Sequence, residues 1–170
     1  MEFSPDIIEK LPKLEIFSDF TENTEDNLRI LKKICHALET KTFSKGDVII
    51  KEGDIGNTLY ILHTGSVQVK RNTQGNEQFA VVNLSADQNV FFGEIALIDS
   101  DRRSASVVAL ENCRTLCLDG STFKALCDEE PLLGYRATYR IACRIASSLR
   151  RLNEDLLTLY EALLDEVDGE

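Results

Sequence analysis

The spacing of apolar residues changes twice along this chain, and these changes limit the possible folds more than any other feature. Up to about residue 41, and again after residue 121, apolar side chains recur at helical steps of three and four. Between them lie short runs rich in β-branched residues, such as Val48–Ile50, separated by turn signals at Gly46, Gly53 and Gly65. The pattern predicts an α+β protein. We expect an antiparallel β jelly-roll barrel (a cupin-like double-stranded β-helix) flanked by N-terminal helices and a long C-terminal helix.

The same changes divide the chain into three expected parts. Thr24 is placed to cap the helix that follows it, Ser121 or Thr122 to cap a short helix, and Pro131 to begin the next one. The parts are an N-terminal helical segment (1–41), a β-roll with an anion-binding cassette (42–120), and C-terminal helices with an acidic tail (121–170).

The long C-terminal helix is expected to run from about Leu132 to Leu164. Apolar residues within it step alternately by four and three, as in a heptad seam: Ile145, Leu149, Leu152, Leu156, Leu159 and Leu163. Two interpretations stay open. The seam either packs against the barrel or pairs with the same helix of a second copy.

An arginine stripe at helical spacing, Arg136, Arg140 and Arg144, lies on the same helix. It is either a solvated face or a surface for an acidic partner. The tail from Glu154 to Glu170 holds seven acids and no base, so it is one candidate for that partner, supplied by another protomer.

The charge balance excludes some classes of function. With 19 basic and 29 acidic residues, the net charge is −10, which argues against general nucleic-acid binding and against adhesion to anionic membranes. No apolar run is long enough to cross a bilayer, and the N-terminus lacks a signal-peptide pattern. The five cysteines are odd in number and include no C-x-x-C pair, so we expect a reducing, cytoplasmic setting.

The segment from Phe91 to Val107 carries the most chemical information. Gly93 allows a sharp turn, and the residues after it, Glu94–Leu97, can begin a helical turn whose free N–H groups suit an anion. Arg103 follows and can grip phosphate oxygens through two hydrogen bonds. Ser104 adds a hydroxyl donor, while Ala105 keeps the site open.

These residues resemble the phosphate-binding cassette of the cyclic nucleotide-binding domain family. Phe92–Leu97 (FGEIAL) and Arg103–Ser106 (RSAS) match its two ends, and residues 43–69 match the family's leading glycine-turn signature. The resemblance covers about residues 14–160. Its register selects Arg103, rather than the neighbouring Arg102, as the phosphate ligand. The family includes the sensor domain of the bacterial catabolite activator protein and the regulatory domains of cyclic-nucleotide-dependent kinases.

The resemblance implies a role for each residue of the cassette. Arg103 would neutralise the cyclic phosphate, and Glu94, with Gly93, would contact the ribose. The phosphate oxygens would accept hydrogen bonds from the Ser104 hydroxyl and from four N–H groups, those of Ile95, Ala96, Ser104 and Ala105. The base would lie on Val81 or Val107, under a lid formed by the helix after residue 131.

The sequence departs from the family pattern at two places. The glycine expected before the cassette is replaced within Leu84–Val90, where Asn89 is a residue that tolerates positive φ. Asp99 and Asp101 lie between the two ends of the cassette, and we expect both to face solvent.

The leading hypothesis is a non-catalytic, stand-alone sensor of a cyclic nucleotide, with cAMP favoured over cGMP and no other cofactor. Its partners would be the nucleotide, a second copy through the C-terminal helix, and an output protein. A ligand-free interaction or dimerisation module is the alternative. A DNA-binding regulator is disfavoured because only 40 residues follow Glu130. An enzyme is least favoured, because no nucleophile with a positioned base stands out. His36 and His63 lie in different elements, which argues against a metal site with two histidines. Cys113 and Cys117 fit buried thiols better than a metal or redox pair.

Overall fold

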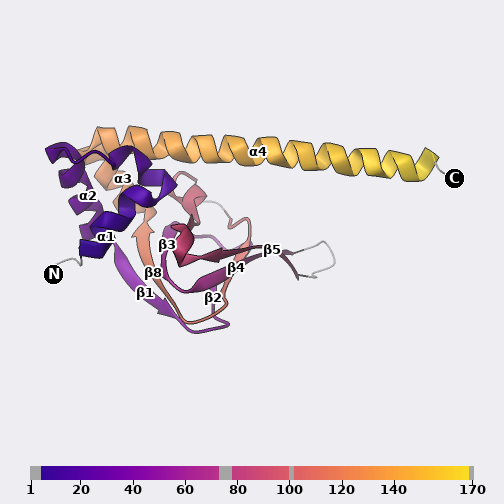
Figure 1. Ribbon diagram of the computed structural model, residues 1–170, viewed down its shortest axis with the longest axis horizontal. Coiled ribbons are helices and arrows are strands. Elements are labelled where there is room, and N and C mark those ends of the chain that lie inside the picture. The colour runs from indigo at the N-terminus through magenta and orange to yellow at the C-terminus, as the bar shows by residue number, and fades with distance from the viewer. Residues whose placement is uncertain (1–4, 73–77, 100–101, 169–170) are drawn as a thin grey trace.

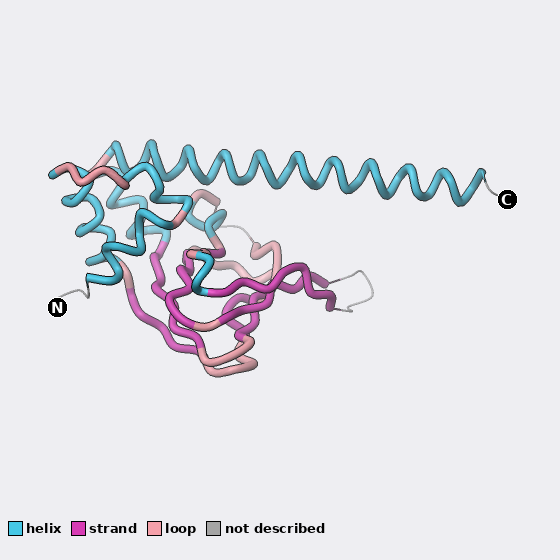
Figure 2. Tube along the Cα trace, viewed as in Figure 1, coloured by secondary structure: helices cyan, strands magenta, loops and turns pink. Residues whose placement is uncertain are grey.

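Two antiparallel sheets of four strands each form the body of the molecule in this computed structural model (Figure 1, Figure 2). The structure describes residues 5–72, 78–99 and 102–168. The strand orders are β1-β8-β3-β6 and β2-β7-β4-β5. The strands are β1 (Glu39–Phe43), β2 (Val48–Ile50), β3 (Thr58–Thr64), β4 (Ser66–Asn72), β5 (Gln78–Ser85), β6 (Phe91–Phe92), β7 (Ser106–Ala109) and β8 (Cys113–Asp119). The predicted α+β jelly-roll architecture is confirmed.

Helices precede and follow the sheets, and the N-terminal ones gather beside the start of the long C-terminal helix (Figure 1). Before the first strand come α1 (Pro5–Lys10), η1 (Leu11–Lys13), η2 (Glu15–Phe20) and α2 (Glu25–Ala37), and after the last come α3 (Gly120–Glu129) and α4 (Pro131–Asp168). Two short turns, η3 (Ala86–Gln88) and η4 (Glu94–Leu97), lie between strands. Pro131 begins α4 as expected.

Side-chain caps fix where α2 and α3 begin. The Thr24 hydroxyl accepts a hydrogen bond from the Asn27 N–H at 3.2 Å, as the sequence predicts. The prediction for α3 is wrong. Asp119, at the end of β8, is the cap, and its carboxylate accepts from the N–H groups of Ser121 and Thr122. A carboxylate at this end also complements the helix dipole.

Apolar side chains form two clusters, one inside the barrel and one between the barrel and the helices. The second cluster holds the first turns of α4 through Leu133, Ala137 and Ile141, each at most 1% exposed. Phe17 and Phe20 of η2 belong to the same cluster. Burial of these residues anchors the start of α4 to the N-terminal helices.

The arginine stripe of α4 is neither a solvated face nor a surface left open for the acidic tail of another protomer, because its side chains contact η2 of the same chain. Arg136 donates to the Asp19 carbonyl at 2.9 Å and lies over the Phe20 ring, and Arg140 forms an ion pair with Asp19. The Arg140 guanidinium holds the pKa of the Asp19 carboxyl below its ordinary value. The acidic partner is therefore η2 of the same chain, which the sequence pattern did not indicate because those acids are more than a hundred positions away.

The second half of α4 extends past the barrel (Figure 1). All six seam residues from Ile145 to Leu163 are between 40% and 66% exposed. The interpretation that the seam packs against the barrel is therefore wrong.

Candidate functional site

Two glycines make room for the side chain of Arg103. A Cβ atom added to Gly56 would lie 2.9 Å from the Arg103 Nε, and one added to Gly93 would lie 2.7 Å from its Nη1. Real Cβ atoms do not approach this closely, so a larger residue at either position would displace the guanidinium. The loop between β2 and β3 and the turn after β6 thus form a slot that fits arginine.

Backbone groups hold Arg103 in this slot. Its guanidinium donates to the Thr58 carbonyl at 2.8 Å and to the Gly93 carbonyl at 3.3 Å, and its own N–H donates to the Asp54 carbonyl. Burial lowers the pKa of the Arg103 guanidinium, while Tyr60 and Glu94 act in the opposite direction. An arginine stays charged under such conditions. The slot therefore presents a fixed, half-buried cation.

The helical turn that the sequence predicts after Gly93 is present. Gly93 has φ = 78°, a left-handed conformation that favours glycine, and η4 starts directly after it. The Ala96 N–H donates to the Gly93 carbonyl at 3.3 Å. Among the described residues, no hydrogen bond uses the N–H groups of Ile95, Ser104 or Ala105, and Ser104 is exposed. These three N–H groups are thus not used by the hydrogen bonds of the described residues.

Glu94 directly follows Gly93, and its side chain contacts α4. Its Oε1 accepts from the Arg144 Nε at 3.2 Å, and its side chain is only 14% exposed. Arg144 also lies over the Phe91 ring, 4.5 Å from the centroid, and pairs with Glu15. A single arginine thus connects the cassette with η2 and α4.

Sequence reasoning missed three of these residues: Gly56, Thr58 and Arg144. Gly56 was noticed as part of the leading glycine signature, but the signature did not indicate that this glycine makes room for Arg103. Thr58 acts through its carbonyl, which no side-chain pattern can indicate. Arg144 was visible only as one member of the arginine stripe.

The structure also places the lesser candidates. Arg102, the rival of Arg103, is exposed and donates to the Gly53 carbonyl. Asp99 is exposed, as expected, whereas Asp101 lies outside the described residues. Val81 on β5 is 47% exposed, but Val107 on β7 is 3% exposed, so of the two only Val81 presents a surface.

Asn89 takes the place of the family's glycine, and its backbone conformation is one that asparagine can adopt. It adopts φ = 51°, the left-handed conformation that asparagine tolerates. Just before it, Ser85 and Gln88 form a reciprocal capping box at the start of η3, in which each side chain accepts a hydrogen bond from the other residue's N–H. The turn before the cassette is therefore built with different residues.

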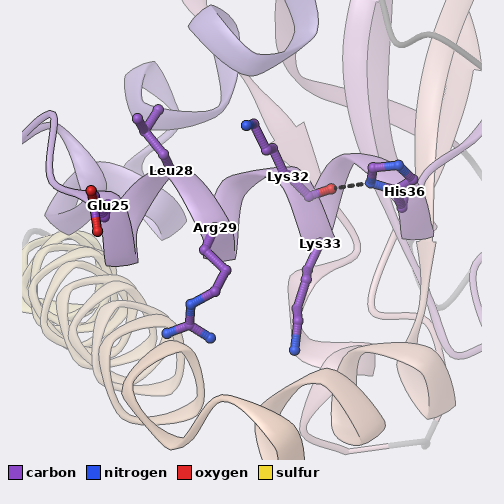
Figure 3. Close-up of a pocket in the computed structure, with 6 residues that line it drawn as sticks. All are labelled: Glu25, Leu28, Arg29, Lys32, Lys33 and His36. Carbon is purple, nitrogen blue, oxygen red and sulfur yellow. Dashed lines mark hydrogen bonds between the residues drawn. The ribbon is translucent and has the colours of Figure 1, made fainter.

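A hollow of about 460 Å³ lies along α2 (Figure 3). Its lining is basic, but the two cations nearest α3, Arg29 and Lys33, form ion pairs with Glu130. None of its lining residues belongs to the cassette.

Other kinds of site find no support in the described part of the chain. It contains no group of three or more His, Cys, Asp or Glu side chains placed to hold a metal. Cys113 and Cys117 are buried free thiols, and burial raises the pKa of both. Thiols of this kind are unreactive. In the same part of the chain, no helix is both long and apolar enough to span a membrane.

The sequence and the fold both resemble those of known proteins. A family model described as "Cyclic nucleotide-binding domain" matches residues 40–130. Human cGMP-dependent protein kinase 2 is 42% identical over 94 residues, which are 55% of this chain but only 12% of the kinase. This chain thus spans a small part of that relative.

Solved structures give the same result. The regulatory domain of Toxoplasma gondii PKA, crystallised with cAMP, is 26% identical, with a TM-score of 0.67 over 84% of this chain and 49% of that one. A cyclic nucleotide-binding domain from Methylobacillus flagellatus has a TM-score of 0.73 over 89% of this chain and 83% of the other, at 22% identity, which supports the fold alone.

Proposed function

This chain belongs to the cyclic nucleotide-binding domain family, and from that membership we propose that it binds a 3′,5′-cyclic nucleotide without catalysis, as a stand-alone sensor. The observation that carries the proposal is the slot in which Gly56 and Gly93 leave room for the Arg103 guanidinium. A fixed cation beside unused N–H groups is the arrangement that a phosphate diester requires.

Each residue of the cassette has a proposed role. Arg103 pairs with the cyclic phosphate, whose oxygens also accept from the N–H groups of Ile95, Ser104 and Ala105 and from the Ser104 hydroxyl. Ala96 keeps the turn compact through its bond to Gly93, and Glu94 accepts from the ribose 2′-hydroxyl. Glu94 keeps a second carboxylate oxygen for the ribose while Oε1 faces Arg144.

We favour cAMP over cGMP as the ligand. The relatives include kinases named for each nucleotide, so both belong in the test. Titration calorimetry with cAMP and with cGMP is expected to give a saturable signal with at least one of them. A folded protein that shows neither heat nor a thermal shift with either nucleotide would contradict the proposal and favour the ligand-free alternative.

One prediction concerns the ribose. Changing Glu94 to Gln removes the charge of the acceptor but keeps its size, and we expect about a tenfold loss of affinity. A 2′-deoxy cyclic nucleotide provides the control. The wild-type protein should discriminate against it, and the Glu94→Gln variant should discriminate much less. Equal discrimination by both proteins would show that Glu94 does not contact the ribose.

We further propose that the output passes through α4, in the cytoplasm, to a protein partner. Arg144 supports this because it connects the proposed ribose acceptor to that helix. The free cysteines suit a reducing compartment. We also propose that α4 forms a homodimer, because its seam is uncovered in the single chain.

A further inference from the structure

The first helix, α1, contacts the barrel through two polar side chains that lie outside the proposed nucleotide site (Figure 1). The Asp6 carboxylate lies 3.3 Å from Nε2 of His63, on β3. At the other end of α1, the Lys10 ammonium donates to the Ala86 carbonyl at 3.1 Å, and Ala86 begins η3. Because η3 is followed by β6 and the turn at Gly93, α1 bridges β3 and the segment that leads into the cassette.

His63 is a buried histidine with one unused ring nitrogen. Its side chain is only 10% exposed, and its Nδ1 has no hydrogen-bond partner among the described residues. In the neutral tautomer that fits this place, the Nε2–H group faces Asp6 and Nδ1 keeps a lone pair. Protonation would place an N–H donor on Nδ1 as well. That donor would be buried without an acceptor, which is unfavourable.

The surroundings of His63 also act against its protonation. Burial, and after it the positive charges of Arg114 on β8 and Lys10 on α1, lower the pKa of His63 below the ordinary histidine value, while the Asp6 carboxylate acts in the opposite direction. The ring therefore binds a proton more weakly here than it would in water. Uptake of a proton by His63 favours a state in which α1 has moved away and water reaches the ring.

We propose that α1 is a pH-sensitive strap, which holds the turn before the cassette while His63 is neutral and releases it when His63 is protonated. Since the docked state binds the proton more weakly than the open state, docking is strongest above about pH 6.5, the ordinary pKa of histidine. It weakens as the pH falls from there, and the loss is complete below the pKa of the docked state. Uptake of one proton raises the open fraction by at most about tenfold per pH unit.

A proton NMR titration tests the protonation of His63 directly, because the chain has only two histidines. The His36→Gln variant assigns the signals, since His36 is an exposed residue of α2. We expect His63 to titrate below about pH 6.5. In Asp6→Asn, which removes the carboxylate charge, it should titrate lower still. A midpoint at or above 6.5, or an unchanged midpoint in Asp6→Asn, would overturn the proposal.

Hydrogen exchange of residues 6–13, corrected for its intrinsic pH dependence, tests whether α1 opens. Between pH 7.5 and 5.5, we expect opening to increase by up to about tenfold in the wild type and in the control His36→Gln. It should stay constant in His63→Gln, whose amide can donate to Asp6 but takes up no proton. No increase in the wild type, or an equal increase in His63→Gln, would contradict the strap. Both measurements are made without nucleotide.

The effect of the strap on the cassette rests on the proposed function. Titration calorimetry at pH 7.5 and 5.5 should show a loss of nucleotide affinity in acid, up to about tenfold, in the wild type but not in His63→Gln. Lys10→Met removes the donor to the Ala86 carbonyl and should lower the affinity at both pH values. Equal losses in the wild type and His63→Gln would show that α1 does not act on the cassette. A protein that binds no nucleotide at either pH would contradict the proposed function, while NMR and exchange still decide whether the strap exists.

Discussion

Replacing Arg103 with alanine is expected to abolish most of the affinity for a cyclic nucleotide. The phosphate would enter a half-buried site without the fixed cation of Arg103, and an unpaired buried charge costs about 3 kcal/mol, or roughly a hundredfold in affinity. Titration calorimetry with the preferred nucleotide measures the loss.

Arg102→Ala is the matched control, because Arg102 is the adjacent arginine but is exposed and donates to the Gly53 carbonyl. We expect its affinity to stay close to that of the wild type. Arg103→Ala also leaves the Thr58 and Gly93 carbonyls without a donor. Thermal unfolding of the variant must therefore show that it is folded at the titration temperature. If a folded Arg103→Ala protein bound as tightly as the wild type, the anion site would have been assigned to the wrong arginine.

Replacing Gly93 with alanine is expected to impair both stability and binding. At φ = 78° an alanine costs about 1–2 kcal/mol of folding free energy. Its Cβ would also lie 2.7 Å from the Arg103 Nη1 and 2.9 Å from the Thr58 carbonyl oxygen. Displacement of the guanidinium should lower the affinity about thirtyfold, as expected for the loss of charged hydrogen bonds.

Gly46→Ala separates these two effects. Gly46 also has positive φ, +92°, but an added Cβ would meet nothing within 4 Å. Both variants should lose thermal stability through the positive φ, Gly93→Ala the more because of its close contacts, and only Gly93→Ala should lose affinity for the nucleotide. Equal affinities in the two variants would show that Gly93 is needed only for its backbone conformation and not to make room for the Arg103 guanidinium.

The architecture was predictable because local signals agree with it. The switch from helical spacing to glycine-separated strand runs, and back again, predicted the jelly roll, and Thr24 and Pro131 predicted where two helices begin. The first turn of η4 was predictable for the same reason, since Gly93 and the residues after it form one local pattern. The capping of α3 was missed because Asp119 reads equally well as the last residue of a strand.

Contacts between distant segments were not predictable. The ion pair of Arg140 with Asp19 joins residues 121 positions apart, and no periodicity within α4 specifies it. Likewise, the contact between Arg144 and Glu94 depends on how α4 crosses the cassette. The slot around Arg103 depends on absent side chains at Gly56 and Gly93, and a sequence shows a glycine without showing what occupies its space.

The firm anchoring of α4 at its start has a mechanical consequence. Leu133, Ala137 and Ile141 hold the first turns among the N-terminal helices, so the helix and those helices should tilt together as one lever. The free arm from residue 145 to the end of α4 at Asp168 is about 35 Å long at 1.5 Å per residue. A tilt of about 10° at the base would therefore move the tip by about 6 Å, given that arm length. A small movement of α4 near Glu94 would thus produce a larger movement at the far end of the helix.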